Sequence, residues 1–204
     1  MTLHIYDLDK TLVRKNASFA FYFYLLSSAR LPLSTLLSVI PLYFRYQTGL
    51  SLEKLHREIF EKVLRGKPLS LFLGAVEPFL ARFLKRELRS NLLMKGEGQV
   101  RWLLSSSPQF LVEPIAKSLG FDLWKGTEYT VDKWGKFCQI SSLVDGYRKL
   151  TFAKEAPFQR EQIVAYSDGE EDLPLLEWAG RACVVNPGKN LRKLAQQREW
   201  EIIK

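Results

Sequence analysis

Cysteine and histidine are scarce in this chain of 204 residues, which has two of each. Cys138 and Cys183 lie 45 positions apart, a separation typical of neither a disulfide framework nor a zinc site. The two isolated His residues offer no imidazole cluster. These absences exclude a disulfide-stapled domain and predict a reducing, cytoplasmic environment. Any bound metal should be a hard cation with oxygen ligands.

Long hydrophobic runs are also missing. Two uncharged runs of 14 residues, 16–29 and 31–44, are divided by Arg30, and the second contains Pro32 and Pro41. A membrane-spanning helix needs roughly 20 apolar residues. We therefore expect no standard transmembrane helix. We also expect no targeting segment, since the sequence begins with neither a basic leader nor a signal-type apolar stretch.

Acidic side chains are absent between Asp9 and Glu53. Residues 14–98 contain 14 Lys and Arg against six Glu, and so carry the whole net charge of +8. Residues 19–46 hold eight of the 26 aromatic residues. This basic, aromatic segment fits either a packed helical domain or a peripheral contact with an anionic membrane. Nucleic-acid binding is disfavoured, because no known motif is visible and the segment is more apolar than a phosphate-tracking groove.

Hydrophobic periodicity and turn residues predict the order of the secondary structure. The predicted helices are 18–29, 33–46, 51–65, 69–89, 108–119, 146–155, 171–178 and 188–197. The predicted strands are 2–8, 100–104, short strands or a hairpin within 123–140, 162–167 and 181–185. The alternation predicts an α/β fold with a Rossmann-like parallel sheet formed by residues 1–13 and 99–204. Residues 14–98 are predicted to be a helical insertion.

Polar side chains gather where three of these strands end. The first strand ends in a segment that contains Asp7, Asp9 and Thr11, a run of Ser begins at Ser105, and Asp168 follows the strand 162–167. The carboxyl ends of parallel strands meet at one edge of the sheet, where ligands bind. Clustered carboxylates repel one another unless a cation joins them. We therefore predict a Mg²⁺ site at this edge.

This order of motifs resembles the haloacid dehalogenase superfamily of phosphohydrolases, in the branch of phosphoserine phosphatase. Asp7-Leu-Asp-Lys-Thr11 is similar to the first motif, Ser105 to the second, Lys149 in Gly146-Tyr-Arg-Lys to the third, and Asp168-Gly-Glu-Glu-Asp172 to the fourth. The resemblance covers nearly the whole chain. It implies that residues 14–98 form a cap between the first two motifs.

The resemblance also implies a role for each acidic residue. Asp7 would attack phosphorus and form an aspartyl-phosphate. Asp9 would protonate the leaving group and then activate water. Mg²⁺ would be held by the carboxylates of Asp7 and Asp168 and by the backbone carbonyl of Asp9, while Asp172 would orient a metal-bound water.

Further residues are implied to bind the substrate phosphate. They are Thr11, Ser105, Ser106 and Lys149. Ser106 is the alternative to Ser105 at the second motif, and Lys154 is the alternative to Lys149. His4 and His56 are expected to be structural.

The substrate is less sharply indicated. Phosphoserine phosphatases carry a Glu nine residues beyond the nucleophile to bind the substrate ammonium, and Asn16 stands there in this chain. The basic, aromatic cap resembles that of C-type phosphatidylglycerophosphate phosphatases, which implies a lipid phosphate and a peripheral membrane contact. The alternatives are a small soluble sugar phosphate or nucleotide and, less favoured, phosphoserine. A third hypothesis is a non-enzymatic phosphate-binding or interaction module.

Overall fold

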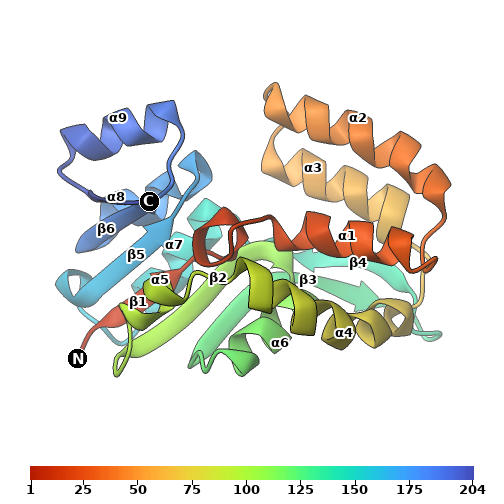
Figure 1. The fold of residues 1–204 in the computed structure, drawn as a ribbon, viewed down its shortest axis with the longest axis horizontal. Coiled ribbons are helices and arrows are strands. Elements are labelled where there is room, and N and C mark those ends of the chain that lie inside the picture. Colours follow the sequence, from red (N-terminus) through yellow and green to blue (C-terminus); the bar gives the residue numbers. More distant parts are fainter.

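A computed structural model describes residues 1–204, apart from the side chains at positions 43 and 47. Its centre is a seven-stranded sheet with the spatial order β4-β3-β2-β1-β5-β6-β7 (Figure 1). The strands are Leu3–Tyr6 (β1), Val100–Pro108 (β2), Leu123–Val131 (β3), Phe137–Ser142 (β4), Ile163–Ser167 (β5), Arg181–Val185 (β6) and Glu201–Ile203 (β7). Neighbouring strands run parallel, and the pair β3 and β4 is antiparallel.

Helices cover both faces of this sheet. They are Ala17–Ser27 (α1), Leu36–Gln47 (α2), Leu52–Ile59 (α3), Leu69–Glu87 (α4), Ser90–Met94 (α5), Gln109–Ser118 (α6), Gly146–Glu155 (α7), Leu173–Trp178 (α8) and Lys189–Gln197 (α9). The predicted α/β fold with a mostly parallel sheet is confirmed. Strand β1 lies at its centre, so the residue that follows β1 is surrounded by other strand ends.

The two faces of the sheet have separate apolar cores. Every residue of β1 is buried, as expected for a central strand with helices on both sides. Successive side chains point to opposite faces. Ile5 packs with residues of α7, α8 and α9, whereas Tyr6 packs with residues of α1, α4 and α6.

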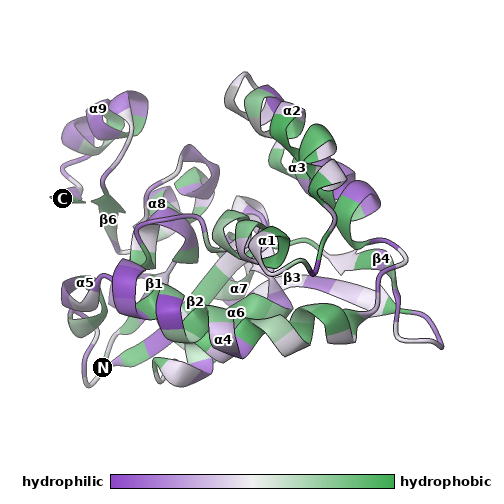
Figure 2. Cartoon of the chain, turned by 45° about the vertical axis from the view of Figure 1, so that its right-hand side comes forward, coloured by the Kyte–Doolittle hydropathy of each residue, from purple (hydrophilic) through white to green (hydrophobic). Residues whose placement is uncertain are grey.

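The segment between β1 and β2 supplies α1 to α5. Asn16 caps the start of α1 by accepting a hydrogen bond from the Phe19 amide at 2.8 Å. Phe21 of α1 meets Phe79 of α4 with ring centroids 5.2 Å apart. Helices α2 and α3 lie side by side and stand off from the sheet (Figures 1 and 2). The division into a core of residues 1–13 and 99–204 and a cap of residues 14–98 stays a prediction about domain organisation.

Several boundaries differ from the sequence prediction. Strand β2 does not end at residue 104 but continues to Pro108, because it resumes pairing with β3 at Thr127 after an irregularity. A hydrogen bond of 2.7 Å from the Thr127 hydroxyl to the Ser106 carbonyl holds this extension. The short elements α5 and β7 were not predicted. Among the helices that the structure describes, none is long and apolar enough to cross a membrane.

Candidate active site

The first acidic residue of the site is fixed by the central strand. Asp7 directly follows β1, and its amide donates a hydrogen bond of 2.9 Å to the Tyr166 carbonyl of β5. The chain then turns sharply at Lys10, which has a φ of 59°. Gly adopts this left-handed conformation without strain, and Lys10 adopts it here as a residue with a Cβ atom. The turn brings Asp9 back over the sheet edge.

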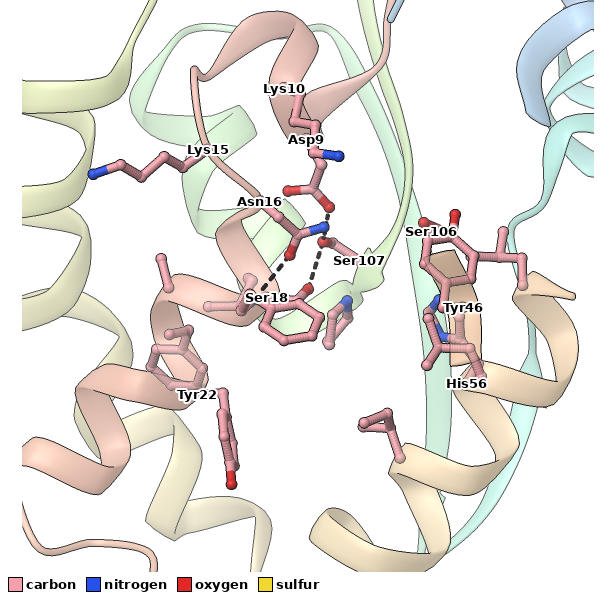
Figure 3. A pocket seen from close by; sticks show the side chains of 18 of the residues that line it. Asp9, Lys10, Lys15, Asn16, Ser18, Tyr22, Tyr46, His56, Ser106 and Ser107 are labelled. Carbon is pink, nitrogen blue, oxygen red and sulfur yellow. Dashed lines mark hydrogen bonds between the residues drawn. The ribbon is translucent and has the colours of Figure 1, made fainter. Parts of the chain in front are cut away.

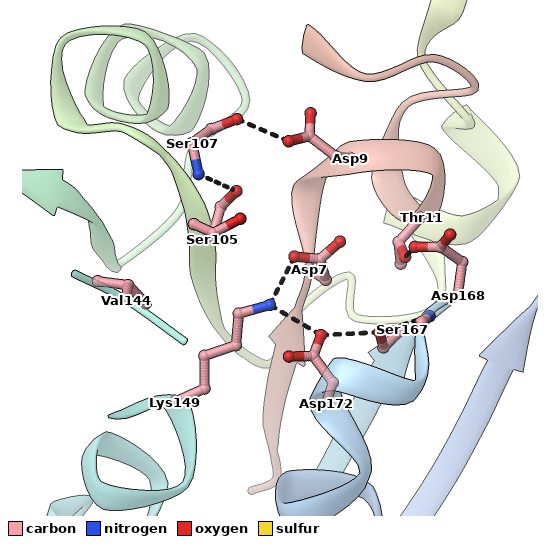
Figure 4. Close-up of polar contacts among 12 residues, drawn as sticks. Asp7, Asp9, Thr11, Ser105, Ser107, Val144, Lys149, Ser167, Asp168 and Asp172 are labelled. Carbon is pink, nitrogen blue, oxygen red and sulfur yellow. Dashed lines mark hydrogen bonds and ion pairs between the residues drawn. The ribbon is translucent and has the colours of Figure 1, made fainter. Parts of the chain in front are cut away.

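Lys149 joins two carboxylates that come from distant parts of the sequence. Its ammonium donates to an oxygen of Asp7 at 2.6 Å and to an oxygen of Asp172 at 2.7 Å (Figure 4). The Lys149 side chain is only 5% exposed. Asp145 starts α7 by accepting a hydrogen bond from the Arg148 amide at 2.8 Å, and this places Lys149 on the first turn. Lys154, the alternative, is exposed on the same helix.

Asp9 is held by the beginning of α1 and by β2. One of its oxygens accepts from the Ala17 amide at 2.6 Å, and the other accepts from the Ser107 hydroxyl at 2.6 Å. The Ser107 hydroxyl also lies 2.6 Å from that of Ser18 on α1. The position at a helix N-terminus favours negative charge on Asp9. Asp9 thus lies where the N-terminus of α1 meets β2.

The fourth motif forms the opposite wall. Asp168 accepts a hydrogen bond of 3.0 Å from the hydroxyl of Thr11. Asp172 accepts one of 2.7 Å from the Ser167 hydroxyl, on the oxygen that also contacts Lys149. Thr11 thus contacts a carboxylate, and its predicted role in phosphate binding has no direct support in this arrangement.

The consecutive serines of β2 point in different directions. Ser105 is fully buried, and its hydroxyl accepts a hydrogen bond of 3.1 Å from the Ser107 amide. Ser106 and Ser107 line the cavity described below, and Ser105 does not. The contact of Ser107 with Asp9 was missed by the sequence prediction. Simple alternation could not give this contact, because the pairing of β2 with β3 is irregular between Leu104 and Pro108.

Burial makes ionisation of the acidic residues costly. It raises the pKa of Asp7 well above its usual range; Lys149 opposes the rise, whereas Asp172, Asp168 and Asp9 add to it. Burial also raises the pKa of Asp9, although the hydrogen bonds from Ser107 and Ala17 hold it down. The pKa of Asp168 is raised to about 6, again mainly by burial. A divalent cation would relieve this repulsion.

The donor set fits a hard cation. Asp7 and Asp168 each have one oxygen engaged by a side chain, which leaves the other for a metal. Within the described part of the chain, no three side chains of His, Cys, Asp and Glu form a metal-binding group. The metal-ligand set that the family resemblance implies does not need three such side chains, since it combines two carboxylates with the backbone carbonyl of Asp9.

These residues lie at one end of a cavity of about 710 Å³. Its remaining walls are mostly apolar and come from α1, α2, α3, β3 and α6. Figure 3 shows Ser18 and Tyr22 of α1 on one side of the open space, with Tyr46 and His56 of α2 and α3 across from them. The hydroxyl of Tyr46 donates to the carboxylate of Glu171 and ties α2 to the loop of the fourth motif. The cavity is large enough for a phosphate together with a sizeable organic group.

Comparison with known families identifies this arrangement. The sequence model described as haloacid dehalogenase-like hydrolase matches residues 5–177, which include every residue of the candidate site. A probable phosphatase of Mycobacterium tuberculosis is 35% identical over 108 residues, which cover 50% of this chain and 37% of that protein. The chain thus spans little more than a third of this relative's length.

Solved structures share the fold over the full length. A protein of unknown function from Bordetella pertussis has a TM-score of 0.84 at 22% identity, with 99% of this chain and 97% of that chain covered. A phosphoserine phosphatase, solved as a phospho-aspartyl intermediate analogue, has a TM-score of 0.67 at 17% identity and covers 99% and 92%. At these identities, the likeness shows the fold alone.

Proposed function

Because the chain belongs to the haloacid dehalogenase-like hydrolase family, we propose that it is a Mg²⁺-dependent phosphatase that hydrolyses phosphomonoesters through an aspartyl-phosphate. The contact of Lys149 with both Asp7 and Asp172 is the observation that carries this proposal. A buried ammonium beside a nucleophilic carboxylate holds that group in place and offers a positive charge to an incoming phosphate.

The reaction is a pair of displacements at phosphorus. An oxygen of Asp7 forms a bond to phosphorus while the bond to the ester oxygen breaks. Asp9 gives its proton to the departing alkoxide, and its raised pKa suits this task. Asp9 then takes a proton from water, which attacks phosphorus and releases inorganic phosphate and free Asp7.

Mg²⁺ would be held by the carboxylates of Asp7 and Asp168 and by the backbone carbonyl of Asp9. When bound, it neutralises negative charge on the phosphate, so that an anionic nucleophile can approach. Lys149 would supply further positive charge, and Ser106, which lines the cavity, would donate to a phosphate oxygen. Ser105 does not line the cavity. In this proposal it acts indirectly, because its hydroxyl holds the Ser107 amide.

The chemistry is tested with p-nitrophenyl phosphate. The wild type should turn it over with Mg²⁺ and lose that activity in EDTA. Asp7→Asn should lower kcat by at least about 1000-fold, whereas Asp132→Asn, in the connection between β3 and β4, should leave it unchanged. With ³²P-labelled p-nitrophenyl phosphate, whose leaving group departs without a proton, Asp9→Asn should slow the attack of water and accumulate a hydroxylamine-sensitive label on Asp7. An unchanged rate in Asp7→Asn would overturn the proposal.

We further propose that the substrate is a lipid phosphate reached from a membrane surface. Four apolar residues form an outer stripe at helical spacing along α2 and the turn before it. They are Leu33, Leu37, Ile40 and Phe44, with exposures of 68%, 81%, 46% and 64%. Ile40 of this stripe also lines the cavity, as does Phe23 of α1, which is 51% exposed. The apolar cavity therefore meets solvent beside the outer stripe, a geometry suited to a substrate whose chains remain in a bilayer.

The lipid proposal has its own test. Leu37→Asp should reduce sedimentation with phosphatidylglycerol vesicles and hydrolysis of a vesicle-borne lipid phosphate, and leave p-nitrophenyl phosphate hydrolysis unchanged. Leu73→Asp, at a half-exposed position on α4, is the matched control. Arg30→Glu with Arg45→Glu should act in the same direction by repelling the anionic surface. A wild type that ignores vesicles but hydrolyses sugar phosphates or nucleotides would favour the soluble alternative.

A further inference from the structure

Two polar side chains stand in the apolar part of the cavity. His56 of α3 and Tyr129 of β3 both line it. They lie close together, because Phe60 stacks on the ring of Tyr129 at 5.8 Å between centroids and His56 lies one helical turn before Phe60. Their neighbours on the wall are apolar, among them Leu55, Ile59 and Phe110.

Neither polar tip has a hydrogen-bond partner among the described residues. Burial alone lowers the pKa of His56 to about 4, and burial alone raises the pKa of the Tyr129 hydroxyl; no hydrogen bond or charge contributes to either shift. Both groups are therefore neutral at neutral pH. Both side chains are partly exposed, and both line the same cavity. Two polar groups without a protein partner on one cavity wall point to a ligand that supplies the partners.

We propose that His56 and Tyr129 form a recognition subsite for a neutral hydroxyl on the organic part of the substrate. A neutral imidazole offers one donor and one acceptor, and a phenol offers one donor and acceptor lone pairs. This pair can satisfy a hydroxyl, which also donates and accepts. The subsite has no formal charge, so an ammonium or a carboxylate would lose its hydration there without gaining an opposite charge.

The inference rests on the proposed function and narrows its substrate class. The phosphate binds at Asp7 and Lys149, while the apolar walls take a hydrocarbon portion that carries a hydroxyl near His56. A phosphomonoester of a neutral, partly apolar, hydroxylated alcohol has this chemistry. A charged amino-acid phosphate does not, which agrees with Asn16 in place of an ammonium-binding Glu.

Three probes separate the contributions. 1-Octylglycerol 3-phosphate has the hydroxyl and the chain, octyl phosphate has only the chain, and glycerol 3-phosphate has only hydroxyls. The wild type should prefer the first probe in kcat/KM. His56→Leu and Tyr129→Phe should each lower kcat/KM for this probe about tenfold, mainly by raising KM. The same variants should change kcat/KM for octyl phosphate by less than about twofold. His56→Gln, which keeps a donor and an acceptor, should retain most of the wild-type preference.

The outcomes are distinct. If His56→Leu and Tyr129→Phe lower kcat/KM equally for 1-octylglycerol 3-phosphate and octyl phosphate, or for neither, the proposed subsite is wrong. Glycerol 3-phosphate used as well as its octyl ether would overturn the role of the apolar walls. Hydrolysis of p-nitrophenyl phosphate but of none of the three probes would overturn this inference and leave the proposed function standing. Failure to hydrolyse p-nitrophenyl phosphate as well would overturn the proposed function itself.

Discussion

The ammonium of Lys149 lies between the carboxylates of Asp7 and Asp172, 142 residues from the first and 23 from the second along the chain. The three groups are almost fully excluded from solvent, with side-chain exposures of 5%, 11% and 6%. Removal of one partner from a buried ion pair is strongly destabilising, because the remaining charge loses both its hydration and its partner.

Lys149→Met should therefore reduce stability as well as activity. We expect the free energy of unfolding to fall by about 3–5 kcal/mol and kcat to fall at least about 100-fold. Urea denaturation and p-nitrophenyl phosphate kinetics measure the two effects. Lys154→Met, on the exposed side of the same helix, is the control. If both variants lose the same stability, the contact with Asp7 and Asp172 has no special importance.

Ser107 should act as a positioning residue for Asp9. Ser107→Ala removes the 2.6 Å hydrogen bond to Asp9, which raises the pKa of that carboxyl further. We expect kcat to fall about 10- to 100-fold. The acidic limb of the pH–rate profile should move to higher pH, because Asp9 must be ionised to activate water in the second displacement, and its raised pKa makes that ionisation harder. Ser107→Thr keeps the hydroxyl and should restore both. A lower rate with an unmoved profile would show that Ser107 has only a packing role.

The convergence of Asp7 and Asp168 was predictable from sequence, because parallel strands of a buried sheet bring their carboxyl ends to one edge. The orientation of the serines was less accessible. A shift of one residue in a strand exchanges its two faces, and the irregularity of β2 between Leu104 and Pro108 adds such a shift. Sequence order alone could not reveal that Ser107 reaches Asp9.

His56 shows a second limit of the sequence. A single His on an amphipathic helix is expected to be structural, and its neighbours along the chain give no other indication. Its place in the cavity wall depends on how α3 packs beside Tyr129, which comes from a strand more than 70 residues away. Contacts of this kind are set by tertiary packing, and local pattern does not encode them.

Mg²⁺ should stabilise the folded chain as well as support turnover. Asp7 and Asp168 are buried carboxylates whose repulsion a divalent cation would relieve. At 100 times its dissociation constant, a ligand adds about 2.7 kcal/mol, or roughly 5–10 °C in Tm for a chain of this size. Differential scanning fluorimetry should show this rise in the wild type and not in Asp168→Asn. An equal rise in the variant would place the metal elsewhere.

His56 should make stability depend on pH in the acidic range. Burial lowers the pKa of His56 from 6.5 to about 4, so the folded chain binds this proton less readily than the unfolded chain. The contribution of neutral His56 to the free energy of unfolding is therefore complete above pH 6.5 and is lost as the pH falls toward 4. Between pH 7 and 4.5, the wild type should lose on the order of 2 kcal/mol more than His56→Leu. Urea denaturation at both pH values measures this, and a constant difference between the proteins would contradict it.

Tyr46 and Glu171 should control how firmly α2 rests on the site. Burial raises the pKa of Tyr46, so its hydroxyl stays protonated and can donate to the Glu171 carboxylate. Tyr46→Phe should raise KM about 2- to 10-fold, in keeping with about 0.5–1.5 kcal/mol for one hydrogen bond, and should leave kcat nearly unchanged. It should also speed proteolysis at residues 48–51, between α2 and α3. Glu171→Leu should have the same effects, and the double variant should be no worse than either single variant, because both remove one contact. Additive effects in this cycle would mean that the two side chains act separately.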